Sequence, residues 1–160
     1  MKNMNLFNRY RCTYCGNSCD NLDHVIPVLY TYNSRKNVSY SKKFTVPSCG
    51  ECNTLLGDKM FLTIGDRAAY LSQRYAKRFD KYLMMPVWGQ DEIDELEGRL
   101  RQQIKIDIDR KESIKKRVKH IDMVTQLCPT IEEVWLIIDD CKYDKEITSE
   151  QIEPNKKVEL

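Results

Sequence analysis

Two pairs of cysteines have the residue types and the spacing best suited to chemistry in this chain. Cys12 and Cys15 form one C-x-x-C pair, and Cys49 and Cys52 form a second. A two-residue spacer lets a tight turn direct both sulfurs at one point, and two such turns supply the four thiolates of a tetrahedral zinc site. We therefore predict that these four cysteines hold a structural Zn²⁺.

Three polar residues adjoin the cysteine pairs. Asp23 and His24 end an apolar segment after the first pair, and Asn53 follows Cys52 directly. Carboxylate and amide oxygens suit Mg²⁺ or Mn²⁺, and a histidine with an ordinary pKa of about 6.5 can take a proton from an attacking water near neutral pH. These residue types fit metal-assisted hydrolysis of a phosphodiester, in which the cation polarises the phosphate and neutralises the departing oxygen.

The pattern C-x-x-C, D-H-x-x-P, C-x-x-C-N over residues 12–59 resembles the HNH endonuclease family, the ββα-metal or His-Me finger nucleases, in its zinc-stapled form. The run from Gly50 to Asp58 resembles phage-type members. The resemblance implies an α+β fold with a zinc-stapled ββα-metal core followed by an α-helical extension. It also implies a metal-dependent endonuclease with His24 as general base and with Asp23 and Asn53 holding Mg²⁺ or Mn²⁺.

One position departs from the family pattern. Phe44 stands five residues before the third cysteine, where the family usually has an asparagine that braces the loop bearing the base. Either another loop residue such as Asn33, Asn37 or Ser39 braces His24, or the histidine is held more loosely. Phe44 lends weight to an alternative function, a catalytically idle zinc module that binds nucleic acid or a partner protein.

The pattern of apolar, polar and turn-forming residues divides the chain into three parts. Residues 1–65 are expected to form the core, with strands at 22–26 and 44–46, the second ended by Pro47, and a short helix from about residue 50 to Gly57. Residues 66–138 form a helical extension packed on the core or projecting from it. Residues 139–160 form a charged tail.

Within the extension, the spacing of apolar residues predicts a helix over 66–83 that Asp66 caps. A longer helical stretch runs from Asp91 to about Gln126, either as one helix or as two broken near Asp109. Thr130 and Glu133 resemble a capping box that starts a last helix over 131–138. The long apolar stripe completes the core or offers a surface for a homodimer.

Charge is unevenly distributed along the chain. Residues 1–85 contain 13 basic and 6 acidic side chains, whereas residues 86–160 contain 13 and 18. A positive N-terminal half suits a phosphate-rich partner, DNA before RNA, although a solvated surface explains the charge alone equally well. The candidate contacts to nucleic acid are four basic residues: Lys42, Lys43, Lys59 and Arg67. His120 lies in a charged helical segment, and we expect it to be solvated.

The sequence carries no apolar run of the roughly 18 residues that a membrane-spanning helix needs, and its start has no apolar stretch typical of a secretory signal. We therefore expect an intracellular, cytoplasmic protein with no membrane partner. Cytosolic thiols are kept reduced, so seven cysteines favour metal binding over a disulfide framework.

Overall fold

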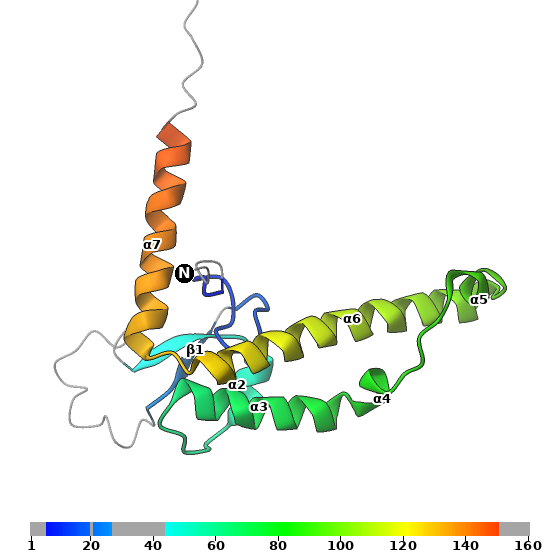
Figure 1. Ribbon diagram of the computed structural model, residues 1–160, viewed down its shortest axis with the longest axis horizontal. Coiled ribbons are helices and arrows are strands. Elements are labelled where there is room, and N and C mark those ends of the chain that lie inside the picture. Colours follow the sequence, from blue (N-terminus) through cyan, green and yellow to red (C-terminus); the bar gives the residue numbers. More distant parts are fainter. Residues whose placement is uncertain (1–5, 20, 27–43, 151–160) are drawn as a thin grey trace, which may run out of the picture.

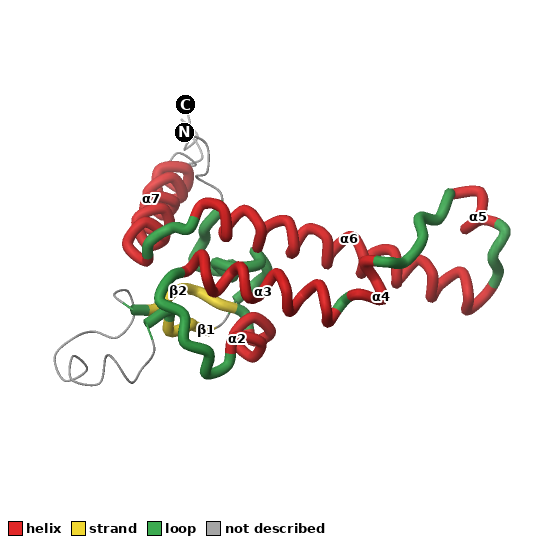
Figure 2. Tube along the Cα trace, turned by 60° about the horizontal axis from the view of Figure 1, so that its bottom comes forward, coloured by secondary structure: helices red, strands yellow, loops and turns green. Residues whose placement is uncertain are grey.

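A computed structural model of the chain describes residues 6–19, 21–26 and 44–150. A small two-stranded sheet and a short helix lie at one end of the molecule, and two helices packed side by side extend from them as an arm (Figures 1 and 2). The protein is therefore mixed α+β. No helix among the described residues combines the length and apolar character needed to cross a membrane.

The sheet consists of β1 (Asn21–His24) and β2 (Thr45–Ser48), paired antiparallel with Asp23 opposite Val46 and His24 opposite Thr45. The prediction that Pro47 ends the second strand is wrong, since Pro47 lies inside β2. A two-stranded sheet leaves each strand with a free edge, where a residue without an N–H is tolerated. The carbonyl of Pro47 accepts a hydrogen bond from the backbone N–H of Thr13 at 2.8 Å.

Helix α2 (Gly50–Leu56) follows β2 at once, as the sequence predicts. Gly57 ends it with a φ of 54°, a left-handed conformation that glycine adopts without a steric penalty. The order β1, β2, α2 places a helix beside the sheet at the point where the second cysteine pair lies.

The next helices form the arm. Helix α3 (Ile64–Arg78) is capped by the Thr63 side chain, which accepts from the Asp66 N–H at 3.0 Å, so Asp66 is not the cap. The helix breaks at Phe79 and resumes as α4 (Asp80–Leu83) instead of running through to residue 83. The chain then turns at α5 (Gln90–Asp94) and returns along α3 as α6 (Gly98–Leu127).

Helix α6 is continuous through Asp109, so of the two predicted alternatives the one with a break near Asp109 is excluded. The interruption falls at residues 95–97, just before Gly98, whose φ of 55° favours glycine. The buried residues of α6 lie between Lys111 and Val124, whereas Leu100 near its start is 59% exposed. The arm therefore packs on the core near Ile121 and projects away from it near α5.

Helix α7 (Ile131–Glu150) continues past residue 138, where the sequence predicted its end. Its first turn carries the predicted capping box: the Thr130 hydroxyl accepts from the Glu133 N–H at 3.2 Å, and the Glu133 carboxylate accepts from the Thr130 N–H at 2.8 Å. The indole of Trp135 donates to the Thr45 carbonyl at 2.8 Å. This contact fixes α7 against β2.

Candidate metal centre and adjoining pocket

Four buried cysteine sulfurs converge at one point. The Sγ atoms of Cys12, Cys15, Cys49 and Cys52 all lie within 4.8 Å of one another. The predicted convergence of the two pairs is thus confirmed, and Cys19 lies outside the group. Four sulfurs at this separation can hold a metal ion such as zinc.

Local backbone geometry forms each of the two turns. In the first turn the Gly16 N–H donates to the Cys12 carbonyl at 2.9 Å, and Gly16 adopts a φ of 72°. In the second turn Cys49 is the N-cap of α2, and its Sγ accepts from the Cys52 N–H at 3.5 Å. A thiolate is stabilised at a helix N-terminus, because the exposed N–H groups there favour negative charge.

The acid–base properties of the thiols also suit a cation. A hydrogen bond from Cys12 is the main cause that lowers the pKa of Cys49 to about 6. The pKa of Cys12 is raised, chiefly by its hydrogen bond with Cys15, and that of Cys52 is raised, chiefly by its hydrogen bond with Cys12. Four such close thiols cannot all ionise unless a positive charge lies among them. The donor set therefore fits Zn²⁺.

Side chains from the arm surround the sulfurs. The Tyr75 hydroxyl from α3 lies 3.5 Å from the Sγ of Cys52. Arg117 from α6 donates to that hydroxyl and pairs with the carboxylate of Glu51 on α2. Hydrogen-bonding groups of this kind around a metal site orient its ligands and moderate their charge.

His120 is half-buried, whereas its charged helix predicted a fully solvated side chain. Its Nε2 lies 3.3 Å from the Thr13 carbonyl in the first cysteine turn, and burial lowers its pKa. A Cβ added at Gly16 would lie 2.8 Å from the His120 Nδ1, so glycine is needed for this close approach. His120 therefore packs α6 against the first cysteine turn.

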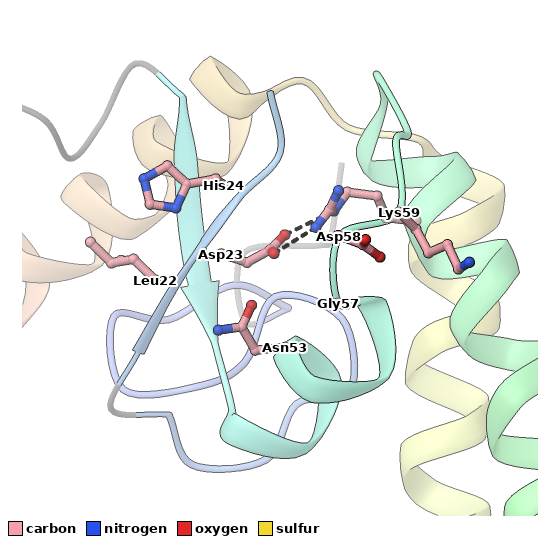
Figure 3. A pocket seen from close by; sticks show the side chains of 8 residues that line it. Leu22, Asp23, His24, Asn53, Gly57, Asp58 and Lys59 are labelled. Carbon is pink, nitrogen blue, oxygen red and sulfur yellow. Dashed lines mark hydrogen bonds and ion pairs between the residues drawn. The ribbon is translucent and has the colours of Figure 1, made fainter. Parts of the chain in front are cut away.

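A pocket of about 320 Å³ adjoins the cysteine group. Asp23, His24 and Asn53 all line it, so the structure brings together the three polar residues that the sequence singled out. Figure 3 shows the side chains of Asp23 and His24 leaving β1 in opposite directions, as alternation along a strand requires. The Asp23 carboxylate pairs with Arg67, which also lines the pocket.

Asp23 is fully engaged within the protein. The Nε and Nη2 atoms of Arg67 donate to its two carboxylate oxygens at 2.8 and 2.6 Å, and the Tyr14 hydroxyl donates to one of them. Both Asp23 and Arg67 are 2% exposed. Burial, followed by the charge of Asp23, raises the pKa of Tyr14 well above its usual value, so Tyr14 stays a neutral donor.

His24 and Asn53 are half-buried, and unlike Asp23 their side chains are not tied up by other side chains of the described residues. Within the described residues, neither side chain makes a hydrogen bond. The two are therefore available to a ligand in the pocket. No second group of three metal-binding His, Cys, Asp or Glu side chains exists in the described part of the chain. Asp23, His24 and Asp58 thus do not form a preassembled cation site.

The predicted nucleic-acid contacts fall in different places. Lys42 and Lys43 lie outside the described residues. Lys59 is exposed at the pocket edge. Arg67 also lines the pocket, but its guanidinium is buried in the ion pair with Asp23, so it is not an exposed group that could contact a phosphate.

Sequence reasoning missed two residues of this site. Asp58, the residue after Gly57, lines the pocket with an exposed carboxylate, five positions along the chain from Asn53. Its position just after the helix that carries Asn53, a candidate metal ligand, could have identified it from the sequence. Tyr14, the partner of Asp23, lies between two cysteines and gave no sequence signal of its own.

Comparisons of the chain with models of known protein families, with curated proteins and with solved structures find no match. The interpretation of the site therefore depends on its own geometry.

We predict that the purified protein contains one zinc per chain, measured by elemental analysis of material prepared without added metal. Cys49→Ala should lose the metal and unfold the N-terminal half, because binding free energy at such a site is also folding free energy. Cys19→Ser is the control, since Cys19 lies outside the group, and it should keep both the metal and the fold. A folded parent protein without metal would contradict the prediction.

A second prediction concerns the buried ion pair. Asp23→Asn should lower the free energy of unfolding by about 3–5 kcal/mol, because it leaves the charge of Arg67 buried without a counterion. Adding Arg67→Met should restore part of the loss, with a coupling of roughly 0.5–3 kcal/mol in a double-mutant cycle measured by urea unfolding.

Asp94→Asn provides the matched control for this cycle. Asp94 pairs with Arg101 at 2.5 Å, but the two side chains are 51% and 39% exposed. An exposed pair contributes at most about 1 kcal/mol. Equal losses from Asp23→Asn and Asp94→Asn would show that the buried pair has no special role in stability.

Proposed function

We propose that this protein is a metal-dependent endonuclease of the HNH type, which hydrolyses phosphodiester bonds of nucleic acid, DNA foremost. The observation that carries the proposal is the shared pocket of His24 and Asn53 beside four converging cysteines. The order of β1, β2 and α2 around that pocket supports it as well, because it matches the order that the resemblance implies.

His24 is the proposed general base. Its imidazole lines the pocket, is half-buried, and makes no hydrogen bond within the described residues, so a ring nitrogen is available to a water molecule. A base in this position takes the proton of the attacking water as the water oxygen bonds to phosphorus. Lys59 at the pocket edge supplies a positive charge for the substrate phosphate.

The proposed oxygen ligands for the catalytic cation are pocket oxygens that are not already paired with another side chain. A bound Mg²⁺ or Mn²⁺ polarises the phosphate and stabilises the departing oxygen. Asn53 offers an amide oxygen and Asp58 an exposed carboxylate in the same pocket. Asp23 can add its carboxylate only if Arg67 withdraws, which would leave a buried charge unpaired at a cost of about 3–5 kcal/mol.

The engagement of Asp23 favours a second candidate function. A carboxylate whose two oxygens accept from Arg67 is a structural group, and a pocket without that ligand suits a catalytically idle zinc module that binds nucleic acid or a partner protein. Incubating supercoiled plasmid with zinc-loaded protein separates the candidates. Nicked or linear product that needs added Mg²⁺ or Mn²⁺ and disappears with EDTA supports the endonuclease, whereas intact plasmid under all conditions supports the idle module.

For the endonuclease, His24→Ala should lower the cleavage rate on the order of 10²–10⁴-fold while zinc content and DNA affinity stay close to those of the parent. Leu22→Ala is the control, because Leu22 lies on the same strand and lines the same pocket without proton-transfer chemistry. If His24→Ala and the parent cleave plasmid at equal rates, His24 is not the base.

Asn53→Ala should weaken the response to Mg²⁺ and leave the zinc in place, since the sulfurs are untouched. Cleavage should fall at low Mg²⁺ and recover partly at high Mg²⁺, and Asn53→His should retain activity with a preference for transition metals, which bind imidazole well. Thr54→Ala is the control: its hydroxyl donates to the Gly50 carbonyl, outside the pocket. Superimposable Mg²⁺ curves for Asn53→Ala and the parent would remove Asn53 from the site.

A further inference from the structure

A second cavity, of about 400 Å³, lies between the end of α3, helix α4 and the middle of α6. It shares no lining residue with the pocket of His24. Glu51 faces the second cavity and Asn53 faces the first, and residues two apart on a helix point in roughly opposite directions. Helix α2 therefore separates two distinct sites.

Positive charge exceeds negative charge in this cavity. Three arginines line it, Arg78, Arg110 and Arg117, against the single carboxylate of Glu51. That carboxylate is shared, because Arg117 pairs with one of its oxygens and Arg78 lies 3.5 Å from the other. Among the described residues that line the cavity, positive charges therefore exceed negative charges by two.

Of the three arginines that line the cavity, Arg110 alone has no carboxylate partner among the described residues. Its guanidinium lies over the ring of Tyr82, 4.8 Å from the centroid, and this contact holds the group at the cavity wall. Arginines near the end of a helix stabilise its terminal carbonyls, which accounts for Arg78 in the last turn of α3. Arg110 lies in the interior of α6, so that explanation does not apply to it.

Arg117 is a second arginine of the cavity wall. Its side chain is 12% exposed and is held in place by Glu51 and Tyr75. Even so, its Nε–H is buried with no hydrogen-bond acceptor among the described residues. Arg117 therefore contributes positive charge at the cavity wall and is fixed in position before any ligand binds.

We propose that this cavity binds a phosphate group. A guanidinium presents paired N–H donors that match phosphate oxygens, and a site already ordered by Glu51 and Tyr82 loses little entropy on binding. Ser113 adds a hydroxyl donor at the cavity wall. The phosphate belongs to a nucleic-acid strand or to a free phosphate compound, and both share this chemistry.

Arg110→Gln tests the proposal, because this residue makes no ion pair whose loss would disturb the fold. Binding is measured without added Mg²⁺ or Mn²⁺, so the result does not depend on cleavage. A labelled single-stranded DNA should bind the variant several-fold more weakly, and the dependence of log affinity on log salt concentration should become less steep by about one. Pyrophosphate should raise the melting temperature of the parent and not that of the variant.

Lys119→Gln is the matched control. It removes one positive charge from the same helix, is exposed, and lies nine residues from Arg110, on roughly the opposite face. Loss of DNA affinity in Arg110→Gln alone assigns the phosphate to a nucleic-acid strand. Loss of the pyrophosphate effect with unchanged DNA affinity assigns it to a free phosphate compound. If Arg110→Gln binds both ligands as the parent does, the proposal is wrong, whatever the plasmid assay shows.

Discussion

Four cysteine sulfurs, from a turn before β1 and from the junction of β2 with α2, converge at one point and bring these two segments together. Each strand has four residues, and an isolated two-stranded sheet of that size is marginally stable in water. A cation at the sulfurs adds its binding free energy to folding. The position of the pocket depends on this, because Asp23 and His24 lie on β1 and Asn53 lies one residue after Cys52.

Two sets of polar contacts connect the cysteine group and the sheet with the helical arm. One runs from Cys52 through Tyr75 to Arg117 and Glu51, and it joins α2, α3 and α6. The other joins β1 to α3 through Asp23 and Arg67. Both are buried or partly buried, so removing one partner leaves a polar or charged group without compensation. The arm is therefore part of the site's architecture as well as an extension of the chain.

Local signals predicted the parts of this structure that depend on neighbouring residues. The two cysteine turns, the end of α2 at Gly57 and the capping box of Thr130 and Glu133 each follow from chemistry within a few residues. The sequence could not show that Arg67 would pair with Asp23, 44 positions away, or that His120 would reach Thr13 across 107. Such contacts depend on how α3 and α6 pack, which spacing along one helix does not determine.

The engagement of Asp23 links the fold to the choice between the two candidate functions. One carboxylate cannot neutralise Arg67 and also bind a divalent cation at full strength, because both compete for the same two oxygens. An active enzyme with this geometry must hold its cation through Asn53, Asp58 and the substrate phosphate, a sparse ligand set of the kind that Mg²⁺ uses when water and phosphate complete its coordination. Affinity for the substrate would then have to come largely from elsewhere on the protein. The arginine-lined cavity on the other side of α2 offers positive charge for that purpose and shares no lining residue with the pocket of His24 and Asn53.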